Sequence, residues 1–279
     1  MNSIYVLFYA KGLCTMNNFY ILKLIREKYA LLLRSAYYEL KSFYAGSVLG
    51  IFWVLIGPMI LIIAYSFVYL YVFKVKPEHM NAHQYVIYVI SGLIPYLGII
   101  QSIQKSSSSI IQNKSILFNT LYPVEFIPLR NVLTINVSTF VCIFAILIYK
   151  IVTFSFAMSH VLVFLYLINV MLFLCGVSLI ISLLTIVLRD IENILQYIFM
   201  LLLFITPIGF FPENLPKAFK IVVYLNPIYY FIRPFQDILA YNQLPSLTIT
   251  LYGLAISLFT FFLGSRFFKA FKISAYELI

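Results

Sequence analysis

Charges are sparse along this chain, and they delimit six long stretches without Lys, Arg, Asp or Glu. About 20 apolar residues suffice for a helix to cross a hydrocarbon core of about 30 Å. The stretches lie between Lys41 and Lys74, between Glu78 and Lys105, between Arg130 and Lys150, and within residues 151–188, 193–211 and 247–265. The pattern predicts an all-α integral membrane protein with six transmembrane helices, which places both ends of the chain on one side.

The basic residues of the flanking segments predict the orientation, because Lys and Arg are retained on the cytoplasmic face. With the N-terminus inside, the inner segments hold thirteen Lys and Arg and the outer segments hold six. We therefore expect a multi-pass protein with both termini in the cytoplasm. This topology, together with contact to acidic lipid headgroups, accounts for the net charge of +10 without a nucleic-acid partner.

Residues 20–44 have the periodicity of an amphipathic helix, with basic residues on a separate face. Its apolar positions are Leu22, Ile25, Tyr29, Leu32, Ala36, Leu40 and Phe43. We expect this helix to lie on the inner membrane surface, either as an anchor or as a protein-docking surface. Residues 1–19 form an N-terminal extension rather than a signal peptide. We expect the functional chain to start at Met16 rather than Met1.

Residues 45–279 form the predicted six-span domain, which begins with three glycines. Gly46, Gly50 and Gly57 have offsets of four and seven, which place them on one face of a helix. Small residues at this spacing let two helices approach closely. The neighbour is a helix either of the same chain or of a second copy.

Composition and motifs exclude a soluble domain and a catalytic role. The chain is 63% hydrophobic and only 10% charged, whereas a soluble domain is about one quarter charged. It has no P-loop, no nucleophile elbow and no H-E-x-x-H, and its spans hold no acidic pair of the kind that ion-coupled transporters use. His79 and His83 have helical spacing without further ligands nearby, so we expect no metal. The cysteines, which are Cys14, Cys142 and Cys175, show no C-x-x-C spacing.

Two regions are irregular where a plain helical bundle would not be. The inner loop 105–130 holds a serine run, a short amphipathic piece and two prolines on either side of Glu125. The stretch 207–234 is rich in proline and has few charges for an outer loop. Broken apolar segments occur at membrane depth only where protein or water satisfies the backbone. We therefore expect a re-entrant pair of short helices that enters from the outside.

Four segments carry a resemblance to a known family. They are YAGSVLGIFWVLIGPMI, SGLIPYLGIIQSIQKSSSSIIQNKSILFNTLYPVEFIPLRNVL, LRDIENILQYIFMLLLFITPIGF and LPKAFKIVVYLNPIYYFIR. In this order they resemble the permease subunits of ABC-2 type polysaccharide exporters, which carry O-antigen, capsular polysaccharide or teichoic acid across the inner membrane. The resemblance covers nearly the whole chain after Met16. Tyr96 and the sequence Tyr122-Pro123-Val124-Glu125 depart from common patterns of the family and leave the cargo subtype open.

The resemblance implies a homodimer bound to two copies of an ATP-hydrolysing subunit. ATP and Mg would be held by that subunit, with no cofactor on this chain. The inner loop would form a coupling helix whose ATPase contacts are Ser108, Asn113, Leu117, Phe118, Tyr122, Pro123 and Glu125. The two half-helices before the last span would form an outer gate that includes Pro207, Pro212, Pro216, Asn226, Pro227 and Arg233.

Aromatic residues are suited to the export of a lipid-linked glycan, because the glycan can slide along flat rings that do not trap it with strong hydrogen bonds. Two sets recur with helical spacing, and we expect them to line the path; they are Tyr65, Tyr69 and Phe73, and Tyr197, Phe204 and Phe211. Headgroup-level anchoring and ordinary core packing are the alternative roles of such residues.

Three other classes of function compete with this interpretation. An ABC-2 exporter of lipids or drugs would share the fold and the ATPase partner and differ in the cargo. A channel or secondary carrier would need no ATPase. A membrane-integral transferase would need acids or histidines at an active site, and the sequence offers no such set.

Overall fold

The computed structural model describes residues 20–69, 80–119 and 121–278, without the side chains of 117–119 and 274–278. Regular structure in these ranges is helical. The longer helices are α2 (Tyr20–Phe43), α3 (Trp53–Phe67), α4 (Ala82–Ser107), α7 (Phe126–Val152), α8 (Val163–Val187), α9 (Ile191–Ile205) and α12 (Leu247–Leu278). The shorter elements are α5 (Ser109–Gln112), α6 (Lys114–Asn119), α10 (Lys217–Leu225), α11 (Tyr229–Leu239) and the 3-10 turns η2 (Gly50–Phe52), η4 (Met158–Leu162) and η5 (Pro212–Asn214).

Among the described residues, five helical segments are long and apolar enough to cross a membrane. They are Gly50–Phe67, Ala82–Ser107, Phe126–Val152, Met158–Val187 and Leu247–Ile273. These segments coincide with five of the six predicted spans. The last one exceeds its prediction, because helix α12 continues through the basic residues that follow residue 265.

The remaining predicted span, residues 193–211, is shorter than the sequence indicates. Helix α9 has 15 residues and ends at Ile205, which corresponds to a length of about 22 Å. Thr206 takes an extended conformation because it precedes Pro207, and proline disfavours helical geometry in the residue before it. Absence of charge thus placed the end of this helix six residues too late.

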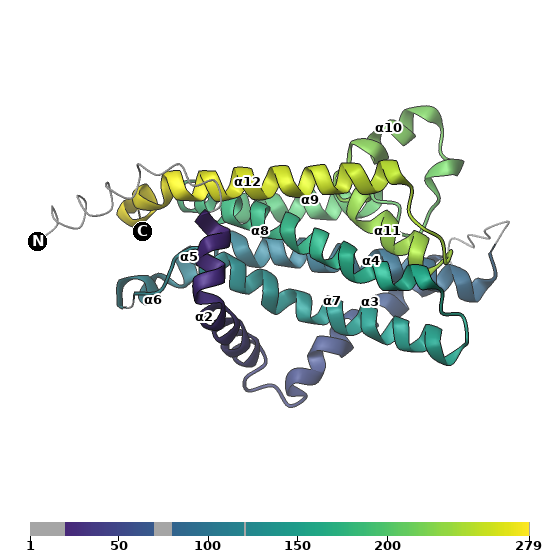
Figure 1. Cartoon of the computed structure of the whole chain (residues 1–279), viewed down its shortest axis with the longest axis horizontal. Helices are drawn as coiled ribbons and strands as arrows, with labels where there is room; N and C mark the ends of the chain where they lie inside the picture. The colour runs from purple at the N-terminus through teal and green to yellow at the C-terminus, as the bar shows by residue number, and fades with distance from the viewer. Residues whose placement is uncertain (1–19, 70–79, 120, 279) are drawn as a thin grey trace, which may run out of the picture.

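The helices α4, α7, α8 and α12 run alongside one another, and α2 crosses them at one end (Figure 1). The C-terminal part of α12 lies at this same end, which we call the near end. Helices α10 and α11 lie at the opposite end, which we call the far end. The Lys272 ammonium bonds the Tyr20 hydroxyl at 2.9 Å, so the start of α2 and the last turns of α12 meet.

Helix α4 lies at the centre of the bundle, since two thirds of its apolar window is buried inside the chain. The largest side chains that it buries are Tyr85, Tyr88 and Tyr96. Helix α3 is peripheral, with only 6% of its window buried. Most of its apolar surface is therefore left for lipid or for another protein.

Helices α8 and α12 approach more closely than ordinary side chains allow. A Cβ atom added to Gly264 would overlap the carbonyl group of Gly176, and one added to Gly176 would overlap the backbone at Thr260 and Phe261. Glycine is required at both positions because the two backbones are in direct contact. The two helices therefore form one packed unit that runs from the far end to the near end.

Candidate functional site

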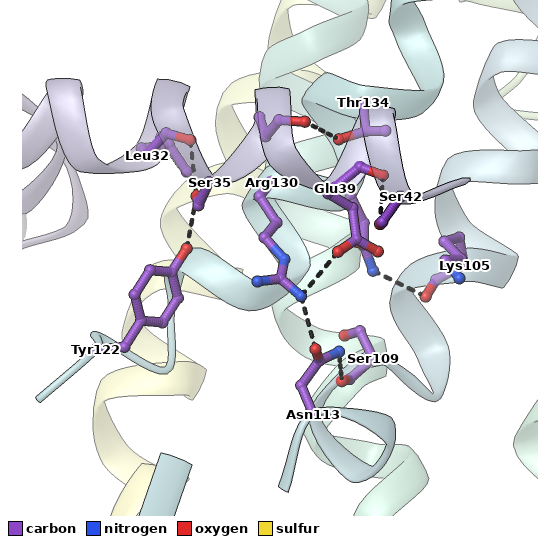
Figure 2. Close-up of polar contacts among 12 residues, drawn as sticks. Leu32, Ser35, Glu39, Ser42, Lys105, Ser109, Asn113, Tyr122, Arg130 and Thr134 are labelled. Atoms are coloured by element: carbon purple, nitrogen blue, oxygen red, sulfur yellow. Dashed lines mark hydrogen bonds and ion pairs between the residues drawn. The ribbon is translucent and has the colours of Figure 1, made fainter. Parts of the chain in front are cut away.

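A polar network joins helix α2, the segment after α4 and the start of α7 at the near end (Figure 2). The Arg130 guanidinium lies 3.0 Å from the Glu39 carboxylate of α2 and donates a 2.7 Å hydrogen bond to the Asn113 side-chain oxygen. Arg130 is buried, with a side chain only 7% exposed. Its charge is thus satisfied by two chain segments that are distant in sequence.

Further hydrogen bonds attach α2 to the same region. The Tyr122 hydroxyl donates to Ser35 Oγ at 2.7 Å, and Thr134 Oγ1 donates to the Ala36 carbonyl at 3.2 Å. Asn131 Nδ2 donates to the Lys105 carbonyl at 3.1 Å, which links α7 to the end of α4. Burial raises the pKa of the Tyr122 phenol above its ordinary value, so it remains a neutral donor.

A second network lies where the inner segment enters α7. The Glu125 carboxylate accepts hydrogen bonds of 2.9 Å from both the Tyr20 hydroxyl and the Lys272 ammonium. The Glu125 side chain is 3% exposed. Burial raises the pKa of the Tyr20 phenol, and the Glu125 carboxylate raises it further, so the phenol keeps its proton. Three segments far apart in sequence are held together at this point.

An open groove of about 690 Å³ lies beside the Arg130 network, between α2 and the inner segment. It is lined by Leu31, Ser35, Tyr38, Glu39, Ser42, Asn113, Ile116, Leu121, Tyr122 and Arg130. The lining combines apolar side chains, such as Leu31, Ile116 and Leu121, with hydrogen-bonding groups, such as Ser35, Asn113 and Tyr122. This mixture suits the docking of a protein surface that offers an apolar anchor and a few hydrogen-bonding groups.

The predicted coupling residues divide into two groups in the structure. Asn113 and Tyr122 line the groove, and Pro123 is half-buried beside it. Ser108 and Glu125 are buried instead. Ser108 donates to Glu192 Oε1 at 3.1 Å, so it bonds within the chain rather than facing a partner. Leu117 and Phe118 lie on α6, and their side chains are outside the description.

The predicted gate residues lie at the far end, in α11 and in the turns around the short helices α10 and α11. Gln236 Nε2 donates to the Pro207 carbonyl at 2.9 Å, and Asn226 Nδ2 donates to Thr206 Oγ1 at 2.8 Å. Pro212 begins η5, and Pro216 precedes α10. Pro227 lies between α10 and α11.

Arg233 of α11 forms two ion pairs, and one of them holds the loop of this region. Its guanidinium lies 2.8 Å from Asp237 on the same helix and 3.2 Å from Glu213 of η5. Sequence reasoning selected Arg233 but missed both acids. Asp237 follows Arg233 by four residues, a spacing from which the ion pair on this helix could have been predicted. No sequence spacing indicates the contact between Arg233 and Glu213.

The two predicted aromatic sets are not continuous stripes. Tyr65 and Tyr69 stack with centroids 6.5 Å apart, and Phe73 lies outside the described residues. Tyr197 and Phe204 are exposed on α9. Phe211, however, follows the end of that helix and packs against Tyr88 at 4.9 Å between ring centroids. The seven-residue spacing was wrong for Phe211, because a helical period applies only while the helix lasts.

The three glycines near the first span do not share one helix face. Gly46 and Gly50 have positive φ angles, at 80° and 51°, and lie in the connection between α2 and α3. Their conformation, rather than close packing, is what requires glycine there. Gly57 lies inside α3, and a Cβ atom there would meet nothing within 4 Å.

One of the two histidines with helical spacing lies within the described residues. His83 Nε2 and the Tyr149 hydroxyl lie 2.7 Å apart in a hydrogen bond at the far end. His79 falls outside the described residues.

Comparison with known proteins agrees with this architecture. Residues 31–240 match the family described as ABC-2 type transporter. The chain is 28% identical to an O-antigen export system permease protein RfbA of Klebsiella pneumoniae over 203 residues, which are 72% of this chain and 76% of the relative. It is 23% identical to the RfbA protein of Myxococcus xanthus over 257 residues, which are 90% of this chain and 96% of that protein. The chain therefore belongs to the ABC-2 type transporter family.

Proposed function

We propose that this chain is the permease subunit of an ATP-driven exporter that carries a lipid-linked polysaccharide, O-antigen or capsular polysaccharide, across the bacterial inner membrane. The observation that carries the proposal is the groove between α2 and the inner segment, in a chain of the ABC-2 type transporter family. The names of the relatives favour O-antigen as the cargo. A teichoic acid exporter is the alternative within the same class.

The proposed complex contains two copies of this chain and two copies of an ATPase, which holds ATP and Mg. The groove supports ATPase docking, because Leu121 is fully exposed there and the Asn113 and Tyr122 side chains line it. The Arg130 network beside it ties the docking surface to the transmembrane helix α7. A displacement of the inner segment by the ATPase would therefore be transmitted directly to the helical bundle.

The proposed topology has six passages and cytoplasmic termini. The described ends of the chain meet at the near end, which requires an even number of crossings. Five long segments and the shorter α9 supply them. In this topology the near end is cytoplasmic, and α10 and α11 form the outer gate.

The first experiment is purification of the tagged chain from its own cells in mild detergent, followed by mass spectrometry of what remains bound. We expect a P-loop ATPase at one copy per permease. Leu121→Asp places a charge on a fully exposed groove residue and should remove the ATPase. Leu244→Asp makes the same change on an exposed far-end residue and should retain it.

The outcomes separate the classes of function. A wild-type purification without ATPase would contradict the exporter and favour a channel or carrier. If the ATPase binds, the cargo is tested by deleting the gene for this chain and extracting glycolipids. A polysaccharide exporter predicts lipid-linked polymer trapped inside the cell, whereas an exporter of lipids or drugs predicts a normal surface polymer.

A further inference from the structure

The Glu125–Lys272–Tyr20 network connects the inner segment with the C-terminal helix α12. Lys272 lies near the end of α12, and its ammonium bonds both Glu125 Oε1 and the Tyr20 hydroxyl at 2.9 Å. The Lys272 side chain is 12% exposed and that of Glu125 is 3% exposed. The ion pair is therefore shielded from water and bonded on both sides, unlike a surface pair.

Helix α12 is continuous from the far end to this network. It has 32 residues, which corresponds to about 48 Å. Its backbone contacts α8 directly at Gly264 and Gly176. Hydrogen bonds of 2.8 Å between Tyr166 and Thr250, and of 2.5 Å from Ser257 to Asn169, fix the same two helices nearer the far end. A helix held in this way moves as one body with its neighbour.

The far end of helix α12 contacts the predicted gate. The Tyr230 ring of α11 lies 5.4 Å from the Tyr252 ring of α12, and the Tyr230 carbonyl lies close to Gly253. From α11, Arg233 reaches the loop at Glu213, and Gln236 reaches Pro207. A displacement of α12 is therefore passed to α11 and to the loop that α11 holds.

We propose that Lys272 is a positioning residue that fastens the exit of the coupling segment to the α8–α12 unit, so that movement driven by the ATPase reaches α10 and α11 at the far end. This inference rests on the proposed function and adds the C-terminal helix to the route. A buried ion pair suits the role, because it fixes two segments in one register without adding much stability over apolar contacts.

The test uses the permease with its ATPase in lipid nanodiscs. Lys217→Cys, at the exposed start of α10, is labelled with a membrane-impermeant maleimide, with and without ATP and vanadate. Lys272→Gln keeps a hydrogen-bond donor for Glu125 but removes the charge. We expect it to retain the ATPase and its hydrolysis rate, while the nucleotide-dependent change in labelling falls about fivefold or more, as for a coupling loss of 1 kcal/mol or above.

Two further variants keep the test decisive. Lys272→Arg preserves the charge and should restore the labelling change, which a merely steric role would not predict. Tyr20→Phe removes the hydroxyl that bonds Glu125 and Lys272 but leaves their ion pair intact. It replaces Lys272→Gln in the test if that variant does not fold. We expect a smaller loss of the nucleotide-dependent change in labelling. An unaltered labelling change in the variant that folds overturns the inference, as does loss of ATPase binding, which would make Lys272 a docking residue. If the wild type binds no ATPase, the proposed function fails instead.

Discussion

Arg130 and Glu39 form an ion pair whose partners are buried to different extents. The Arg130 side chain is 7% exposed and that of Glu39 is 20% exposed. A charge left behind after its partner is removed is costly in proportion to its burial. The two halves of the pair are therefore not equivalent as targets for substitution.

Glu39→Gln should destabilise the fold more than Arg130→Met. The first change leaves a buried guanidinium without its counter-ion, at about 3 kcal/mol, whereas the second leaves a carboxylate that can reach water through the groove. Thermal unfolding of the purified permease in detergent measures both. Equal losses, or a larger loss for Arg130→Met, would show that packing of the arginine stem outweighs the charge.

Gly264→Ala should strongly destabilise the bundle. The new methyl group would overlap the Gly176 carbonyl, and a backbone cannot rotate away as a side chain can, so we expect a loss of about 3 kcal/mol. Gly57→Ala is the matched control, because its methyl group meets nothing; it should raise stability by about 0.5–1 kcal/mol. Thermal unfolding of the monomer in detergent compares them, and a neutral Gly264→Ala would contradict the close contact.

The site residues were only partly predictable. Asn113 and Tyr122 followed from the irregular inner loop and its resemblance to exporters. The neighbouring pair of Arg130 and Glu39 did not, because an ion pair between segments distant in sequence leaves no spacing to detect. Glu125 was assigned to a partner surface for the same reason, since its burial depends on Tyr20 and Lys272, at opposite ends of the chain.

Among the elements, the loop before α10 depends on one long-range ion pair. Glu213 contributes the loop side of this pair and is 60% exposed, whereas the Arg233 side chain is 14% exposed. Asp237 stays beside Arg233 through its place on the same helix. The loop can therefore open while Arg233 keeps Asp237 as its counter-ion.

Glu213→Gln should loosen this loop. Loss of a partly exposed pair costs about 1 kcal/mol or less, which corresponds to up to about fivefold more opening. Maleimide labelling of Lys217→Cys should accelerate accordingly, and high salt should have the same effect on the wild type because it screens the pair. Asn214→Ala changes the neighbouring exposed residue without removing a charge and should leave the rate unchanged. An unchanged rate for Glu213→Gln would show that the pair does not hold the loop.

Element boundaries were predictable where charges coincide with helix ends, as in α4 and α7. They were wrong where a helix ends for another reason. Pro207 ends α9 inside an uncharged stretch, and the close packing of α12 lets a helix continue past Arg266 and Lys269. Counting charges detects the hydrocarbon boundary, but it does not detect where a helix itself stops.

At the scale of the whole molecule, α3 and α9 expose large apolar surfaces. Exposed side chains include Ile60, Ile63, Phe67, Tyr197, Met200, Leu201 and Phe204. Lipid covers such surfaces well, so exposure alone does not identify a partner. A glycine among them, Gly57, allows close approach of a second helix.

Gly57→Trp should separate the proposed homodimer without unfolding the monomer, because the ring would fill the open space beside Gly57, where a second copy would pack. Native mass spectrometry of the permease in detergent reports the number of copies. Met59→Trp adds the same ring about 200° around the helix and should leave the dimer intact. A dimer that survives Gly57→Trp would exclude this glycine from the interface.

The backbone contact between α8 and α12 also has a consequence for biosynthesis. Helices enter the bilayer in the order of their synthesis, so α8 waits there while α9, α10 and α11 are made. Until α12 follows, the Gly176 face of α8 has no partner, and Glu125 lacks the Lys272 ammonium. A nascent chain stalled before Gly264 thus exposes both an uncovered face of α8 and an acid without its counter-ion, two features by which quality-control proteases can distinguish it from the finished protein.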